Sequence, residues 1–175
     1  MDLFSLQHQL GGLTEYPLEQ WHPAFCGAVP IRIDRDGSWY FHGSAITRPE
    51  LVRLFAAVLS CVEGRYLLTT PAEQVQIAVD DAPFVLVDAV WLDGGDLQLT
   101  SNLQQTFIAG PDYPVLLQPE AGSGQLLPYL QLPRGLSAKF SRTLYYRLAQ
   151  QAQELVVDGQ TQYVLCSGDY QFRLG

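Results

Sequence analysis

Two arginines occupy equivalent positions in two similar segments, and their side chains could bind an anion. Residues 47–54 and 141–148 share a hydroxyl residue, an arginine, four intervening residues and an Arg-Leu pair, with an offset of 94 positions. Arg48 and Arg142 therefore stand at the expected openings of two helices, where unpaired backbone N–H groups and the helix dipole also favour an anion. The alternative for either arginine is a weak ion pair with a surface acid.

Aromatic residues near these arginines could stack against the ring of a ligand. Trp39 and His42 lie on the hairpin expected before the first helix, and Tyr145 and Tyr146 lie in the second helix. An aromatic face can stack on a base while an arginine fork holds a phosphate. Trp39 and His42 are therefore the expected walls of a pocket whose charge comes from Arg48 or its counterpart.

Other combinations of reactive residues do not form a recognisable catalytic or metal site. Gly122-Ser123-Gly124 lacks the third glycine of a dinucleotide loop and the frame of a nucleophile elbow, so it is interpreted as a flexible connector. His22, Cys26 and His42 lack the fourth ligand of a structural zinc site. The carboxylates of Asp80-Asp81 should point to opposite faces of a strand and not share a proton. The sequence predicts no catalytic residue, no metal and no cofactor, and an enzyme of unrecognised type ranks last.

Charge is distributed unevenly along the chain. The net charge is −8, and the interval between Arg65 and Arg134 contains eight acidic residues and no basic one. A duplex-binding protein needs a basic stripe, so nucleic acid is not expected as a partner. The apolar runs are too short to span a bilayer, and Met1-Asp2 begins no signal peptide. With three widely spaced cysteines and no C-x-x-C motif, the sequence predicts a cytoplasmic protein with reduced thiols and no membrane association.

Hydrophobic periodicity and turn signals outline the elements that would position these residues. A capping box at Thr47–Glu50 opens a helix that runs to about Cys61. A second helix is expected from about Ser137 to Gln153, and a short one from residue 2 to 10 with Asp2 as its cap. Residues 11–28 are expected to be irregular. Strands are expected at 29–33, 38–41, 66–69, 75–79, 84–92, 97–100, 107–108, 115–118, 126–132, 163–166 and 170–174.

The pattern favours an α+β fold with antiparallel strands over a parallel Rossmann-type sheet, because the helices do not alternate with single strands. The repeat has a second echo, Val62-Glu63-Gly64 against Val157-Asp158-Gly159, which indicates that one helix-then-strand unit was built twice. We expect an N-terminal α+β unit at residues 1–82 and a C-terminal unit at 83–175. Each should have one main helix, with Leu54 and Leu148 at equivalent buried positions.

An ordered set of short motifs resembles the bacterial domain-of-unknown-function family 1285. The match covers nearly the whole chain, from about Pro17 to the C-terminus. One departure is Gln74, which stands where the family often has a basic residue. The matching motifs are Trp21–Pro23, Asp36–Tyr40, His42–Ser44, Arg48, Leu51-Val52, Leu54-Phe55, Thr70–Glu73, Asp80–Phe84, Asn102, Arg134, Leu136, Ala138, Arg142 and Ser167–Gly175.

The resemblance implies a duplicated α+β core whose C-terminal unit is similar to pleckstrin-homology-like folds. It also implies a site for a small nucleotide-like ligand between the two halves and a role in signal transduction, and it carries over no catalytic residue. The expected ligand-binding residues are Trp39, His42, Arg48, Asn102, Arg134 and Arg142.

Two functions from different classes follow. The first is a non-enzymatic sensing or regulatory module that binds a small anionic ligand. The second is a protein–protein adaptor that docks a basic partner through the acidic middle segment or exposed sheet edges. Neutralising Asp93 and Asp96 would weaken binding of the adaptor's partner and leave nucleotide binding unaffected.

Overall fold

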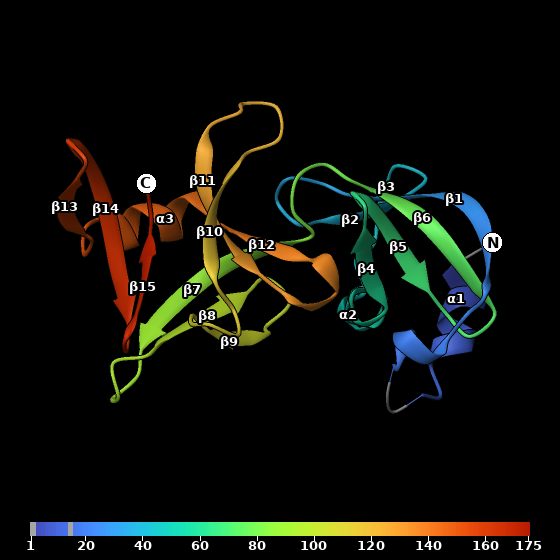
Figure 1. Ribbon diagram of the computed structural model, residues 1–175. Helices are drawn as coiled ribbons and strands as arrows, with labels where there is room; N and C mark the ends of the chain where they lie inside the picture. Colours follow the sequence, from blue (N-terminus) through green and yellow to red (C-terminus); the bar gives the residue numbers. More distant parts are fainter. Residues whose placement is uncertain (1–2, 14–15) are drawn as a thin grey trace. The chain divides into compact units, whose positions relative to one another are not determined.

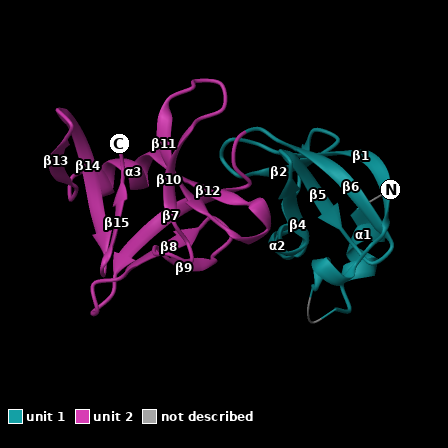
Figure 2. Ribbon diagram, viewed as in Figure 1, with its two compact units in different colours: residues 1–80 teal, residues 81–175 magenta. Residues whose placement is uncertain are grey.

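The computed structural model describes residues 3–13 and 16–175, which divide into two compact units (Figures 1 and 2). Unit 1 comprises residues 1–80 and unit 2 comprises residues 81–175. Each unit contains a six-stranded sheet and at least one helix, so the predicted α+β class is confirmed. No helix in the described part of the chain combines the length and the apolar character that crossing a bilayer requires.

Unit 1 is built from two antiparallel three-stranded meanders. Strands β1, β2 and β3 form one meander, and β4, β5 and β6 form the other. The meanders join because β1 lies parallel to β6, which gives the sheet order β3-β2-β1-β6-β5-β4. The elements are α1 Leu3–Leu10, η1 Leu18–Gln20, β1 Ala24–Ile33, β2 Trp39–Phe41, β3 Ser44–Ala45, α2 Pro49–Ala57, β4 Leu59–Val62, β5 Arg65–Thr69 and β6 Glu73–Val79.

Unit 2 contains a second six-stranded sheet, followed by a helix and a separate three-stranded sheet. The six-stranded order is β10-β11-β12-β7-β8-β9, and the later sheet has the order β13-β14-β15. The elements are β7 Phe84–Trp91, β8 Leu97–Ser101, β9 Thr106–Ile108, β10 Val115–Pro119, β11 Leu126–Gln131, η2 Pro133–Gly135, β12 Ser137–Phe140, α3 Arg142–Ala149, β13 Gln153–Val157, β14 Gln160–Ser167 and β15 Tyr170–Arg173.

The two six-stranded sheets have the same connectivity. In each, the first three strands form one meander, the last three form another, and the first strand lies parallel to the sixth. Strands β1 to β6 therefore correspond in order to β7 to β12. Strand β1 starts at Ala24 and β7 at Phe84, 60 residues later, whereas β6 starts at Glu73 and β12 at Ser137, 64 residues later. The other pairs of each sheet are antiparallel, as expected, and the parallel pair at the centre of each sheet was not predicted.

The 94-residue repeat marks a smaller fragment than the duplicated sheet. Helix α2 is followed by the β4–β5 hairpin, and α3 by the β13–β14 hairpin. The φ values are 51° and 77° in the Glu63-Gly64 turn, and 51° and 76° in the Asp158-Gly159 turn. Two successive positive values are those of a type I′ turn. However, β4 and β5 belong to the six-stranded sheet, whereas β13 and β14 belong to the separate one. The expectation that this offset relates the two halves is therefore wrong.

Both main helices are shorter than the sequence predicts. Helix α2 has Arg48 as its N-cap, without a side-chain hydrogen bond, so the expected Thr47 capping box is absent and only Pro49 at the first turn is as predicted. It ends at Ala57 because residues 59–62 pair with β5. Helix α3 starts after Ser141, whose hydroxyl accepts from the Leu144 N–H at 3.2 Å, because residues 137–140 form β12 between β11 and β7.

The region expected to be irregular, residues 11–28, includes η1 and the start of β1, and β13 was not foreseen in the sequence. The proposed Asp2 cap lies outside the described residues, whereas the short helix itself is confirmed as α1. The likeness of unit 2 to pleckstrin-homology-like folds stays a prediction.

Burial on the two helices differs from the expected symmetry. Leu148 is fully buried, as predicted, but Leu54 is partly exposed, and Phe55 takes the buried position on α2. The Phe55 ring lies 6.2 Å from that of Trp39, centroid to centroid, in the core of unit 1. Leu51 and Phe55 are buried as the periodicity predicts, but Val52 and Ala56 are buried in place of Leu54, so the inward face of α2 is turned by less than one residue, under about 100°.

Candidate functional site

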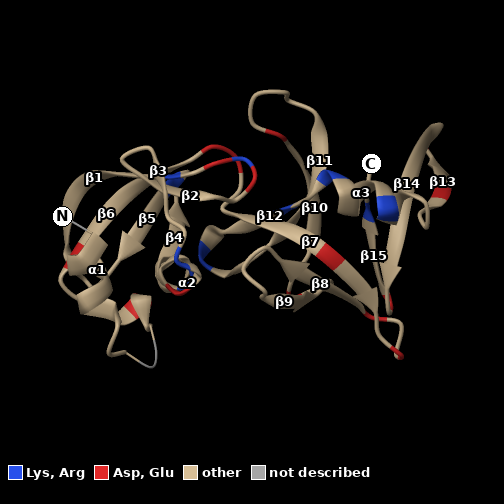
Figure 3. Cartoon of the chain, turned by 180° about the vertical axis from the view of Figure 1, so that it is seen from behind, with Lys and Arg blue, Asp and Glu red and all other residues tan. Residues whose placement is uncertain are grey.

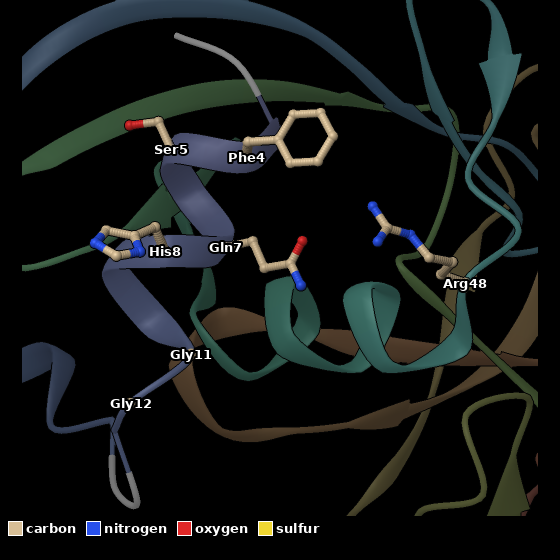
Figure 4. A pocket seen from close by; sticks show the side chains of 7 residues that line it. All are labelled: Phe4, Ser5, Gln7, His8, Gly11, Gly12 and Arg48. Atoms are coloured by element: carbon tan, nitrogen blue, oxygen red, sulfur yellow. The ribbon is translucent and has the colours of Figure 1, made fainter.

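Arg48 borders an open groove on the surface of unit 1. The groove has a volume of about 1000 Å³ and runs along α1 toward the start of α2 (Figure 4). Its lining contains one fixed positive charge and no acidic side chain. The residues that line it are Phe4, Ser5, Gln7, His8, Gly11, Gly12 and Arg48.

Three of these side chains face one another across the groove. Phe4 and Gln7 extend from α1 toward the guanidinium of Arg48, whereas Ser5 and His8 point to the other side of the helix (Figure 4). The Phe4 ring is 72% exposed. None of the described carboxylates forms an ion pair with Arg48. An aromatic face, an amide and a cation are thus available to one ligand.

The apolar face of α1 explains why Phe4 and Gln7 point outward. Leu6 and Leu10, four residues apart, are buried and turn the helix toward the core. The helix is further tied to the sheet through Gln9, which accepts a hydrogen bond from the Thr70 hydroxyl at 2.6 Å and donates to Glu73 at 3.0 Å. Residues on the opposite face of α1 are consequently presented to the groove.

Arg48 also lines a second, smaller hollow of about 210 Å³, together with residues that include Phe41, Thr47 and Leu51. The helix start itself is poorly suited to an anion, because Pro49 has no N–H and Glu50 places a carboxylate in the first turn. The guanidinium, and not the helix dipole, is therefore the feature that could attract an anion at this place.

The other predicted site residues of unit 1 do not line the larger groove. Trp39 is 2% exposed and lies in the core, where its indole Nε1 is the one buried side-chain polar atom without a partner in the described chain. His42 is exposed in the β2–β3 turn, with φ at 47° and its ring against Phe41 at a centroid distance of 4.4 Å. Of the three, only Arg48 contributes to the groove.

The predicted site residues of unit 2 are anchored separately. Asn102 brackets β7, because its side-chain oxygen accepts from the Val85 N–H at 3.1 Å and its own N–H donates to the Val85 carbonyl at 2.7 Å. The Arg142 guanidinium lies 5.8 Å from the centroid of the Tyr146 ring. Arg134 has φ at 61° in the turn before β12. Arg134 precedes β12 and Arg142 follows it, so the two arginines lie near opposite ends of this strand, which is about 13 Å long.

Comparison with known families identifies both parts of the chain. Residues 16–82 match the N-terminal domain, and residues 83–174 the C-terminal domain, of the domain of unknown function DUF1285. The chain belongs to the DUF1285 family. None of the curated proteins compared with this DUF1285 chain matches it.

Two crystal structures of DUF1285 family proteins are similar to this one. The protein from Silicibacter pomeroyi DSS-3 is 34% identical, with a TM-score of 0.84 over 99% of this chain and 94% of that one. The protein from Shewanella baltica OS155 is 26% identical, with a TM-score of 0.58 over 70% of this chain and 92% of that one. These relatives support the two-domain architecture and say nothing of a ligand.

Unit 2 of this DUF1285 protein also contains a largely buried polar network. The Tyr129 hydroxyl donates to Asp81 Oδ2 at 2.9 Å, and the Ala121 N–H donates to Asp81 Oδ1 at 3.0 Å. Lys139, the only lysine of the chain, places Nζ 3.5 Å from Asp81 Oδ2 and 3.7 Å from Glu120 Oε1. These groups satisfy one another, so the network holds the loop after β10 against the sheet.

Arginines from the flanks form ion pairs with further acids of the middle segment. Figure 3 marks the positions of the basic and acidic residues along the backbone. The Arg32 guanidinium donates to both carboxylate oxygens of Asp80, and this hydrogen bonding lowers the pKa of the Asp80 carboxyl. The hydrogen bond from Arg147, at 2.6 Å, likewise lowers the pKa of Asp88. Together with the two acids beside Lys139, at least four of the eight acids in the middle segment have a basic partner.

Sequence reasoning missed Phe4 and Gln7. Leu3, Leu6 and Leu10 identify the buried side of α1, so the available signal was that Phe4 is a large aromatic residue outside that stripe. The second signal, proximity of α1 to Arg48, depends on contacts between α1 and α2 that sequence spacing does not reveal.

Proposed function

We propose that this DUF1285 protein is a non-enzymatic sensing or regulatory module that binds a small anionic ligand carrying an aromatic ring, of the nucleotide type. The groove between α1 and Arg48 is the site. The observation that carries the proposal is the arrangement of Phe4, Gln7 and Arg48 around one open groove without an acidic side chain in its lining.

The three side chains divide the recognition of such a ligand. The Arg48 guanidinium would hold a phosphate through charge-assisted hydrogen bonds, for which its planar fork is suited. The exposed Phe4 face would stack on the base, and the Gln7 amide can both donate and accept. A metabolite sensor needs this kind of reversible binding and no bond chemistry, which accords with the absence of a recognised nucleophile and base in the sequence.

A thermal-shift screen tests binding, with nucleoside mono- and diphosphates, the parent nucleosides and inorganic phosphate as probes. A ligand at 100 times its dissociation constant stabilises the folded state by about 2.7 kcal/mol. Arg48→Ala should weaken nucleotide binding by about 1.5–3 kcal/mol, whereas Phe4→Ala should weaken nucleotides but not inorganic phosphate.

Arg53→Ala is the matched control, because Arg53 is an exposed arginine of the same helix and does not line the groove. Its binding should equal that of the wild type. If no probe shifts the melting temperature, or if Arg48→Ala and Arg53→Ala bind alike, the groove is not the site.

The adaptor function retains one supporting observation. Asp93 and Asp96 flank the β7–β8 turn, and neither forms an ion pair with a described residue. If this turn docks a basic partner, Asp93→Asn with Asp96→Asn should weaken the binding of a Lys/Arg-rich peptide in a titration and leave nucleotide binding unchanged.

A further inference from the structure

A second groove, in unit 2, has a different chemical character. It has a volume of about 590 Å³ and lies between β10 and the three-stranded sheet β13–β15. Strands β10 and β15 lie side by side, and the Val115 N–H donates to the Tyr170 hydroxyl at 2.9 Å (Figure 1). This hydrogen bond closes one side of the groove, and the rest of its wall is formed largely by aliphatic side chains.

Strand register explains why these aliphatic side chains share a face. Gln153, Leu155 and Val157 point to the same face of β13, because alternate residues of a strand share a face. Val164 of β14 lies opposite Gln153 and therefore belongs to that face too. Leu116, across the groove on β10, is 50% exposed, and Val157 is 42% exposed. Apolar side chains gathered in a hollow with this much exposure indicate a binding surface.

Arg173 gives the groove its only charge among the described residues that line it. Arg173 is on β15 and lies opposite Val164 of β14, so it is on the same face as the aliphatic residues. No described carboxylate forms an ion pair with it. The remaining polar side chains of the lining are uncharged, namely Gln162, Tyr170 and Gln171. An aliphatic wall next to a single guanidinium is complementary to a ligand with an aliphatic body and one carboxylate.

We propose that this groove binds a medium-chain aliphatic carboxylate. The chain lies along Leu116, Leu155 and Val157, and the carboxylate meets Arg173. The volume falls within the range of small-ligand sites, roughly 300–1,000 Å³. A nucleotide suits this groove poorly, because several phosphate charges would face one cation and a wall that is largely aliphatic. The site is independent of the α1–Arg48 groove in residues, unit and ligand chemistry.

Isothermal titration calorimetry on the full chain tests the proposal with octanoate and decanoate below their critical micelle concentrations and with 1-octanol below its solubility limit. Full burial of a methylene strengthens binding about fourfold, so in an open groove decanoate should bind about 4- to 16-fold more tightly than octanoate. Octanoate should bind about 10-fold or more tightly than 1-octanol, which has the same number of carbon atoms and no charge.

Two variants separate the head group from the chain. Arg173→Ala should remove the advantage of octanoate over 1-octanol, and Arg173→Lys should retain part of it. Leu116→Ser should weaken both ligands alike. Arg53→Ala in unit 1 is the control and should bind as the wild type does. Both substituted side chains are exposed or half exposed, so melting temperatures should remain close to that of the wild type.

The comparison of octanoate, decanoate and 1-octanol on the unaltered protein does not depend on any variant folding. Absence of decanoate binding at millimolar concentration, equal affinity for octanoate and 1-octanol, or unchanged selectivity in Arg173→Ala would each overturn the proposal. None of these results would affect nucleotide binding at Arg48.

Discussion

Replacing Lys139 tests whether the polar network of unit 2 supports its fold. The Lys139 side chain is 14% exposed and lies between Asp81, 5% exposed, and Glu120, 22% exposed. Lys139→Met keeps the length of the side chain and removes its charge. Asp81 then loses the charge of Lys139 and keeps the hydrogen bonds from the Tyr129 hydroxyl and the Ala121 N–H.

The size of the effect depends on the hydrogen bonds that Asp81 keeps. Removing one partner of a buried ion pair destabilises a protein by about 3–5 kcal/mol when the other charge is left uncompensated. Because Asp81 keeps its hydrogen bonds, we expect a smaller loss, about 2–4 kcal/mol. Arg147→Ala breaks an ion pair of similar chemistry whose side chains are 46% and 53% exposed, and it should cost about 1 kcal/mol or less.

Native-state hydrogen exchange with increasing urea measures the two units separately, because peptides from β11 and β12 report on unit 2 and peptides from β5 and β6 on unit 1. Lys139→Met should lower the opening free energy of the β11 and β12 peptides and leave that of the β5 and β6 peptides unchanged. Adding Asp81→Asn to it should cost less than the two single changes combined, because the double variant no longer contains the carboxylate that Lys139 contacts. A loss no larger than that of Arg147→Ala would refute the buried-pair reasoning.

Two further predictions concern the core and acid stability. Leu148→Ala should destabilise unit 2 by about 2–5 kcal/mol, whereas Leu54→Ala, at a partly exposed position, should cost distinctly less in unit 1; equal losses would mean that α2 is oriented differently. Arg32 holds the folded-state pKa of Asp80 below its unfolded value of about 3.9, so this contribution to stability is complete above about pH 5 and is lost as the pH falls through the lowered pKa. Urea midpoints between pH 6 and pH 2 should therefore decline less in Asp80→Asn than in the wild type, and parallel curves would contradict the assignment.

Much of the fold could be predicted from local turn and strand signals in the sequence. The hairpin at Asp36-Gly37 was predictable because an alternating strand meets a strong turn dipeptide, and the structure pairs Ile31 with Phe41 and Ile33 with Trp39. The same applies to the hairpin over residues 84–100, which forms β7 and β8. Both depend on neighbours in the chain, which sequence reading can see.

Helix ends were misread where a distant strand competes for the backbone. Val58 and Leu59 continue the helical periodicity of α2, but Leu59 pairs with Leu68, and the Glu63-Gly64 turn favours the hairpin. Phe140 fits the apolar face of a helix equally well, yet β12 is held between β11 and β7. The parallel pairing of β12 with β7, like that of β1 with β6, joins segments about 50 residues apart and leaves no local signal.

The candidate site was predictable only in part for a related reason. Arg48 was identified because its type and place suit an anion, but its companions Phe4 and Gln7 come from α1, which reaches it only through the packing of the helices. Trp39 was expected beside it because it is close in sequence. Its alternation along β2 instead directs it into the core with Ile33.

The duplicated sheets and the two grooves are related in a way that bears on function. Strands β1–β6 and β7–β12 share one arrangement, whereas α1, α2, α3 and β13–β15 have no counterpart at the same point of the other unit. The groove at Arg48 is formed by α1 and the start of α2, and the groove at Arg173 is completed by β13–β15. Both proposed sites thus depend on elements added to a repeated scaffold, as expected when function resides in sites built on a fold and not in the fold itself. Because the additions differ, an anionic aromatic ligand and an aliphatic carboxylate can be bound by two units with the same sheet.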